Sequence, residues 1–315
     1  MGVSQKDIFG NAGGEPATPG SYGEAPSGYR LPAATRLGPV RLEIADLGRS
    51  LAFYERTLGL RVLYSESSRA VLGPHGVDTA LVDLHERPGA RPAPRRGRLG
   101  LFHFAILLPD RPALGRFMRH LGTVGVQAGA GDHLVSEALY LHDPDNLGIE
   151  VYTDRPRDTW RRIGRELMMA TDPVDVAALV RAAGDTRWAG MPVGTVIGHL
   201  HLHVGDLAAA NAFYGEGLGF DRTVWQYPGA LFFGAGGYHH HVGTNTWAGS
   251  DATPPEDADA RLLEWTIELP GSAEVDELAQ NLERAGFKVE REAGGGLVAR
   301  DPWETSVRVA VSGDQ

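Results

Sequence analysis

An internal repeat constrains the fold of this chain more than any other feature of its sequence. Residues 46–60 (DLGRSLAFYERTLGL) match residues 206–220 (DLAAANAFYGEGLGF), with equivalent positions 160 residues apart. Each copy follows a stretch of alternating apolar and polar residues, at 40–44 and at 200–204, and each copy has a helical pattern that ends at a glycine. A duplicated unit of one strand, one helix and further strands is the simplest explanation.

A weaker repeat doubles the number of units. The segment FAILLP at 104–109 and its following helix resemble WTIELP at 265–270 and its helix, and each reaches an Asp-Pro turn before a final strand. We therefore predict an α+β fold of four βαβββ modules paired into two barrel-like sheets. The modules, numbered in chain order, lie near 38–87, 99–153, 196–248 and 261–311.

The segments outside the modules differ from them in composition. Residues 1–35 are rich in glycine, proline and serine and have no periodic apolar face, which predicts a disordered arm. Spaced apolar residues in 155–192 predict a helical linker. The predicted division is therefore the arm, modules one and two at 36–154, the linker, and modules three and four at 193–315.

Charge and cysteine content narrow the classes of function. The 315 residues include no cysteine, which excludes disulfides and thiolate metal ligands, and their net charge of −10 argues against nucleic acid as a partner. No apolar run approaches the ~20 residues of a membrane span, and no secretory signal precedes the arm. We therefore expect no membrane partner, a cytoplasmic location and a homo-oligomer. Any metal must be bound by nitrogen and oxygen, first of all from the 12 histidines.

Two histidines and a glutamate occupy corresponding positions in modules two and three. His103 and His199 each lie seven residues before the aspartate that starts the module's helix, and Glu150 lies on the last strand of module two. Two imidazoles and one carboxylate form the facial triad that binds non-haem Fe(II) and leaves coordination positions open. The predicted metal ligands are therefore His103, Glu150 and His199. The predicted ion is Fe(II), with Mn(II) as the alternative.

Modules one and four lack this ligand set. Their equivalent positions hold Pro39, Glu264 and Arg308. Pairing of the modules in chain order would divide the three predicted ligands between two barrels. We therefore predict that modules two and three form the metal barrel, and that modules one and four form a metal-free one.

The run Gly237-Tyr-His-His-His-Val-Gly-Thr-Asn245 offers further polar groups. Strand alternation would place His239, His241 and Asn245 on one face, with Asn245 at the position that corresponds to Glu150. His241 would then lie beside the metal, where an imidazole can donate and accept protons near neutral pH. His133 and Tyr140 are predicted to reach the same pocket, and three residues are predicted to line its substrate-binding part: His201, His239 and Asn245.

At these positions the sequence resembles the vicinal oxygen chelate superfamily of glyoxalases, bleomycin resistance proteins and extradiol dioxygenases, and within it the catechol 2,3-dioxygenases. The most specific segments are 101–109, 131–141, 198–203 and 236–243. The resemblance implies curved sheets around an Fe(II) ion, His241 as the acid–base group, and Tyr140 as a substrate contact. The implied reaction inserts both atoms of O₂ into a catechol-type substrate, with His133 and Tyr140 as hydrogen-bonding groups.

Two other functions are compatible with this scaffold. A glyoxalase-type isomerase or lyase would use Ni, Zn, Mn or Mg, but such sites tend to use a second carboxylate where this chain has Asn245. A small-molecule binding protein of the resistance type holds its ligand without turnover and needs no metal ligands, whereas this chain has a full set. The fold alone does not decide the reaction. The dioxygenase is the preferred interpretation because of the predicted metal ligands.

Overall fold

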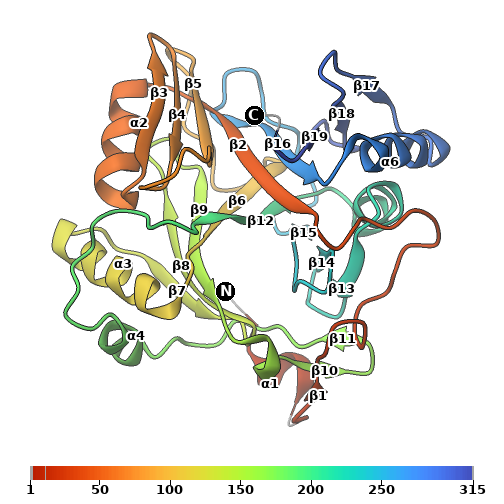
Figure 1. Cartoon of the computed structure of the whole chain (residues 1–315), viewed down its shortest axis with the longest axis horizontal. Helices are drawn as coiled ribbons and strands as arrows, with labels where there is room; N and C mark the ends of the chain where they lie inside the picture. The colour runs from red at the N-terminus through yellow and green to blue at the C-terminus, as the bar shows by residue number, and fades with distance from the viewer. Residues whose placement is uncertain (1–2, 11, 314–315) are drawn as a thin grey trace.

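Two curved eight-stranded sheets and one small sheet make up the computed structural model, which describes residues 3–10 and 12–313 (Figure 1). The predicted α+β fold with two barrel-like sheets is confirmed. Helices lie beside the sheets, with α2 (Leu47–Phe53) and α6 (Ser272–Arg284) next to one of them and α3 (Arg111–Val124) next to the other. None of the helices in the described residues is long and apolar enough to cross a membrane.

One large sheet is built from the middle of the chain, and we call it the middle sheet. Its strand order is β13-β14-β15-β12-β6-β9-β8-β7. The strands, in that order, are Asp221–Val224, Ala230–Gly234, Val242–Asn245, Val196–His203, Gly100–Leu107, Gly148–Asp154, Ser136–His142 and Gly129–Asp132. Strand β6 of module two pairs antiparallel with β12 of module three. Modules two and three therefore share this sheet.

The other large sheet, which we call the outer sheet, joins the first and fourth modules. Its strand order is β17-β18-β19-β16-β2-β5-β4-β3, and β2 pairs antiparallel with β16. The strands, in that order, are Val289–Arg291, Leu297–Arg300, Ser306–Val311, Arg261–Leu269, Arg36–Ile44, Val82–Glu86, Arg69–Gly73 and Arg61–Glu66. Modules one and two thus lie in different sheets, and so do modules three and four.

The repeated motif ties the neighbouring modules together. In both copies the first aspartate caps a short helix, since Asp46 accepts from the Arg49 amide and the equivalent Asp206 caps α5 (Leu207–Ala210). A π-helical segment follows each short helix, η1 (Tyr54–Leu58) and η3 (Asn211–Gly217). The Tyr54 hydroxyl donates to Asp143 of module two at 3.2 Å, and the equivalent tyrosine of module three donates to the Asp-Pro turn of module four. Each tyrosine therefore links one sheet to the other.

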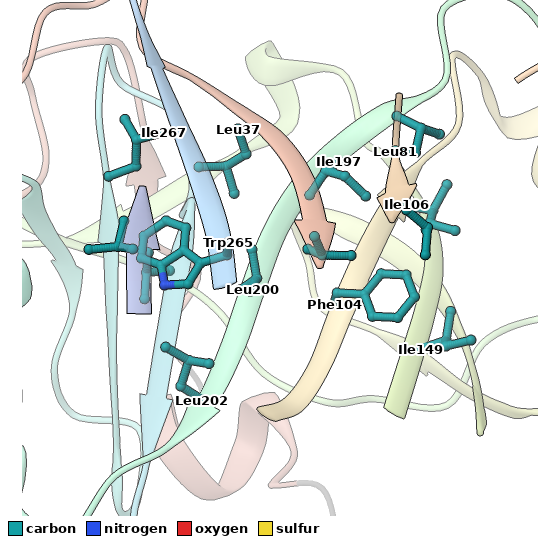
Figure 2. Close-up of a cluster of buried hydrophobic side chains, with 14 of the residues drawn as sticks. Leu37, Leu81, Phe104, Ile106, Ile149, Ile197, Leu200, Leu202, Trp265 and Ile267 are labelled. Atoms are coloured by element: carbon teal, nitrogen blue, oxygen red, sulfur yellow. The ribbon is translucent and has the colours of Figure 1, made fainter. Parts of the chain in front are cut away.

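The hydrophobic core lies between the two sheets. Side chains from β2 and β16 of the outer sheet face side chains from β6, β9 and β12 of the middle sheet (Figure 2). On β12, Leu200 and Leu202 belong to this fully buried core. The strand period of two then turns His199, His201 and His203 to the opposite face of the middle sheet. The sequence alternation thus gives the middle sheet one face that packs against the core and a second face that carries these histidines. We call the second one the chemical face.

The prediction of a disordered arm at 1–35 is wrong for the residues that the structure describes. The arm contains α1 (Gln5–Phe9) and β1 (Glu15–Pro16), and it packs on module three. The buried Tyr22 donates to the Gly237 carbonyl at 2.7 Å, and the Leu31 amide donates to the Gly219 carbonyl at 2.8 Å. These contacts order a segment whose composition alone favours disorder, because tertiary packing outweighs local propensity.

The helical linker predicted at 155–192 is wrong over much of its length. Its helices are the 3-10 turn η2 (Arg157–Thr159) and α4 (Val176–Ala182). The segment between them instead contains two short strands, β10 (Arg161–Ile163) and β11 (Glu166–Leu167). These strands form the small sheet with β1. The spacing that resembled a helix reflects burial of Trp160 and Leu167 against the arm and module three.

Candidate metal centre

Three predicted ligands converge on the chemical face of the middle sheet. His103 on β6, Glu150 on β9 and His199 on β12 lie on three adjacent strands. The Glu150 Oε2 atom is 3.0 Å from His103 Nε2 and 3.3 Å from His199 Nε2. All three side chains are buried, and their ligand atoms lie within 4.8 Å of one another. This is the only such group of three or more potential ligands among the described residues.

The donor set suits a divalent ion bound by nitrogen and oxygen. Burial lowers the pKa of His199 to about 4 although Glu150 acts in the opposite direction, so this imidazole is unprotonated at neutral pH. Burial alone would raise the pKa of Glu150, but His199 and His103 outweigh it and hold that pKa well below its usual range. His199 Nδ1 is buried and makes no hydrogen bond within the described residues. A negative carboxylate and neutral imidazoles are the protonation states that metal binding requires.

The three ligands form part of the wall of a cavity of about 870 Å³. Phe102, Phe232 and Trp247 also line it, and Phe102 and Trp247 are 37% and 41% exposed. A cavity of this volume with several aromatic side chains in its wall suits a flat small molecule. Among the described residues that line the cavity, Glu150 is the only carboxylate.

His133 and Tyr140 line the same cavity and are joined to each other. His133 Nδ1 donates to the Ala170 carbonyl at 2.7 Å, which leaves Nε2 unprotonated in the neutral ring. The Tyr140 hydroxyl then donates to that Nε2 across 2.5 Å. The backbone carbonyl of Ala170 therefore fixes the orientation of both polar side chains in the wall.

His241, the predicted acid–base residue, does not line the cavity, and His240 does. Strand β15 begins only at Val242, so the three histidines follow a turn and strand alternation does not apply to them. Gly236 and Gly237 form this turn with φ of 59° and 68°, and a Cβ at Gly236 would lie 2.5 Å from the Ala33 carbonyl. The structure therefore places His240, and not His241, at the cavity wall.

His241 and His240 have different surroundings. His241 Nδ1 accepts from the Ala235 amide at 3.1 Å, and its ring packs on Phe220 and Tyr238. The His240 ring lies 4.2 Å from the His199 ring, centroid to centroid. No sequence periodicity distinguishes these two histidines, because a turn sets their directions.

A hydrogen-bonded chain fixes the tautomer of His240. His239 Nε2 donates to the carboxylate of Asp154 at 2.9 Å, because an ionised carboxylate only accepts. In neutral His239 the Nδ1 atom is then an acceptor, and it lies 2.7 Å from His240 Nδ1. His240 therefore carries its proton on Nδ1 and keeps the lone pair of Nε2 free. That is the tautomer of a proton acceptor.

Of the three residues predicted for the substrate pocket, His201 lines the cavity, whereas His239 and Asn245 do not. His239 instead supports His240, as described above. The Asn245 side-chain oxygen accepts from the Trp247 amide at 3.0 Å and lies 2.7 Å from His203 Nδ1. Asn245 thus positions a turn and a cavity histidine instead of replacing a metal carboxylate. The prediction for Asn245 is wrong by two residues, because Gly243 pairs with His201 as Glu150 pairs with the equivalent Ala105, whereas Asn245 pairs with His203.

The outer sheet closes its equivalent site with ion pairs. Arg308 on β19 corresponds to Glu150, and its Nε atom donates to Glu264 on β16 at 2.7 Å. Arg41 on β2 approaches the same carboxylate at 3.6 Å. Guanidinium groups thus neutralise in this sheet the negative charge that a metal would neutralise in the other.

The buried histidines predict acid sensitivity of the metal-free protein. Burial lowers the pKa of His199 to about 4 and that of His241 to about 3, and it lowers the pKa of His201 and of His240 well below the usual 6.5. Below pH 6.5 the unfolded chain therefore binds more protons than the folded chain, and the free energy of unfolding falls as the pH drops. Each of these histidines contributes a loss of about 2 kcal/mol between pH 7 and pH 5.

Urea unfolding of the metal-free protein at pH 7 and pH 5 measures this loss. Asp143 opposes it, because burial raises the pKa of Asp143 to about 7 and so favours folding at lower pH. Four histidines against one aspartate leave a net loss of several kcal/mol at pH 5. Equal stability at the two pH values would show that these imidazoles are already protonated or solvated in the folded protein.

Comparisons with known proteins agree with the fold and show the family to which the chain belongs. The family model described as Glyoxalase/Bleomycin resistance protein/Dioxygenase superfamily matches residues 36–151 and 196–307. The chain is 47% identical over 273 residues to the catechol-2,3-dioxygenase of Bacillus subtilis (strain 168), a match that covers 85% of this chain and 94% of that protein.

Two solved structures share the fold at low sequence identity. A provisionally assigned dioxygenase from Bacillus subtilis subsp. subtilis str. 168 has a TM-score of 0.61 at 12% identity, covering 90% of this chain and 87% of the other. Glyoxalase I from Zea mays has a TM-score of 0.52 at 16% identity, covering 88% of this chain and 92% of the other. At these identities the likeness concerns the fold alone.

Proposed function

This chain belongs to the Glyoxalase/Bleomycin resistance protein/Dioxygenase superfamily, and we propose that within it the chain is an extradiol catechol dioxygenase whose metal is Fe(II), bound by His103, Glu150 and His199. The observation that carries the proposal is the convergence of one carboxylate and two imidazoles on the wall of an aromatic cavity. Three protein ligands leave further coordination positions for a substrate that enters this cavity. The 47% identity to a catechol-2,3-dioxygenase supports the same reaction.

When bound, Fe(II) would supply a template for the two catechol oxygens and a route for electron density from the ring to O₂. The protein's own groups handle the protons and the orientation. His240 Nε2 has the free lone pair needed to accept a proton from a catechol hydroxyl, and Asp154 supports this tautomer through His239. Both atoms of O₂ end in the ring-opened product, so the reaction consumes no external reductant.

The cavity walls orient the substrate and exclude water. Phe102 and Trp247 lie at an edge-to-face angle of 85° with centroids 5.8 Å apart, so they offer aromatic surface to a catechol ring. The Tyr140 hydroxyl is oriented by His133 and is available as a hydrogen-bonding partner for the reactants. Removal of bulk water strengthens each of these polar contacts.

A glyoxalase-type reaction is less well supported by the same site. Such sites tend to use a second carboxylate, and the position of module three that corresponds to Glu150 is Gly243, which pairs with His201 as Glu150 pairs with Ala105. Glu150 is the one carboxylate among the described lining residues. The ligand set therefore favours the dioxygenase.

Oxygen uptake tests the proposal directly. The protein is loaded with Fe(II) under anaerobic conditions, and catechol and O₂ are then added. We expect one O₂ consumed per catechol and the appearance of a yellow ring-opened product. Protein that holds a full equivalent of Fe(II) or Mn(II) and consumes no O₂ with any catechol tested would contradict the proposed function.

A further inference from the structure

Two arginines lie in the wall of the cavity and have no carboxylate partner. Arg95 and Arg96 line the cavity that contains the metal ligands. Within the described part of the chain, no aspartate or glutamate lies within ion-pair distance of either guanidinium. This differs from Arg98 nearby, which pairs with Asp259 at 2.9 Å. Two unpaired positive charges beside one cavity stand out in a protein with a net charge of −10.

The loop that carries these arginines is anchored on both sides of them. On one side the Ala93 amide donates to the Asp145 carbonyl at 2.8 Å, and the Asn146 side chain donates to the Ala93 carbonyl at 2.6 Å. On the other side the Gly97 amide donates to the Ala248 carbonyl at 3.1 Å. The loop therefore spans from the Asp-Pro turn of module two to the residue after Trp247. These bonds hold the two arginines close to the aromatic wall.

A second cavity adjoins the first at this loop. It has a volume of about 650 Å³ and shares four lining residues with the metal cavity: Arg95, Arg96, Phe102 and His203. The unpaired guanidinium groups therefore lie where the two cavities meet. An anion at this place would contact both arginines, and an aromatic ring attached to it would lie against Phe102.

We propose that Arg95 and Arg96 bind the carboxylate of a catechol with an acidic side chain, so that acidic catechols are the preferred substrate class. This inference rests on the proposed ring-cleaving function. The metal held by the three ligands would bind the two hydroxyl groups at one end of the substrate, and the guanidinium groups would bind the carboxylate at the other. Guanidinium and carboxylate form paired, charge-assisted hydrogen bonds, which are stronger than bonds between neutral groups.

The test compares a neutral and an acidic substrate in matched variants of the Fe(II)-loaded enzyme. Catechol and 3,4-dihydroxyphenylacetate are the probes, and the variants are Arg95→Gln/Arg96→Gln and the control Arg181→Gln/Arg187→Gln. The control removes the same charge from two exposed arginines outside both cavities. Circular dichroism and thermal melting check that each variant folds. The variant Arg95→Lys/Arg96→Lys keeps the charge without the planar guanidinium group.

We expect wild type to favour the acidic catechol by about tenfold or more in kcat/KM, as charge-assisted contacts predict. The Arg95→Gln/Arg96→Gln variant should lose this preference while its kcat/KM for catechol stays within about threefold of wild type. The lysine variant should retain part of the preference, and the control should retain all of it. No preference in wild type, or an equal loss on both substrates, would overturn the proposal.

A binding measurement separates this inference from the proposed function. Calorimetric titration of the metal-free protein with 3,4-dihydroxyphenylacetate and with catechol needs no turnover. Tighter binding of the acid, lost in Arg95→Gln/Arg96→Gln and kept in the control, supports the arginine site even if no catechol is cleaved. Equal affinity for the two compounds in wild type overturns the arginine site even if catechol is cleaved.

Discussion

Replacement of Glu150 by glutamine is expected to abolish tight metal binding and to lower kcat/KM for catechol by about a thousandfold or more. The Glu150 Oε2 atom lies 3.0 Å from His103 Nε2 and 3.3 Å from His199 Nε2. Glu150 is the only carboxylate of the three ligands, so it supplies their one negative charge. An amide keeps the shape and removes that charge. Metal content after gel filtration and oxygen uptake with catechol are the two measurements.

The matched control is the same carboxylate-to-amide change at Glu264 in the outer sheet. Glu264 accepts from Arg308 at 2.7 Å and has no place in the metal cavity. Glu264→Gln should bind a full equivalent of metal and be less stable than wild type, because it removes the carboxylate of a mostly buried ion pair, in which the Glu264 side chain is 12% and the Arg308 side chain 31% exposed. Full iron content together with wild-type activity in Glu150→Gln would refute the ligand assignment.

Replacement of His240 by glutamine should lower kcat by about 100-fold to 10,000-fold, the usual contribution of a general acid–base group. Glutamine removes the free imidazole Nε2 that lines the cavity, and it leaves all three metal ligands in place. Metal content should therefore remain at one equivalent. Steady-state kinetics of the iron-loaded variant measure the loss.

His241→Gln is the control that separates two adjacent histidines. His241 contacts Phe220, Tyr238 and the Ala235 amide, and it does not line the cavity. This variant should be less stable than wild type and should keep most of its kcat when folded. A large loss of kcat in His241→Gln with an unaffected His240→Gln would restore the interpretation based on strand alternation.

The convergence of the three ligands could be predicted from the sequence because strand geometry is regular. His103 and His199 stand at equivalent places of a repeat, and on β12 the period of two separates His199 from the buried Leu200. The missing ligands in modules one and four then indicated which modules had to meet. These arguments use only residue type and spacing along the chain, and in a regular strand the spacing determines which face each side chain occupies.

The direction of His240 could not be obtained in the same way. Gly236 and Gly237 bend the chain with positive φ, and the following three histidines take directions set by tertiary contacts. The prediction of disorder for residues 1–35 was wrong for a related reason. The described part of this arm is ordered by packing on module three, which its composition does not indicate. Turn geometry and the docking of a segment on distant parts of the chain leave little periodic signal in the sequence.

The order of the modules along the chain also has a consequence for biosynthesis. Every strand of the middle sheet lies between Gly100 and Asn245, whereas the outer sheet needs β16 (Arg261–Leu269) to cover the edge of β2 (Arg36–Ile44). All strands of the middle sheet are therefore synthesised before module four leaves the ribosome. Until then β2 presents an unpaired strand edge, the kind of surface that pairs with other chains. The nascent protein thus passes through a stage at which all three predicted ligands have been synthesised and a strand edge is still open to aggregation.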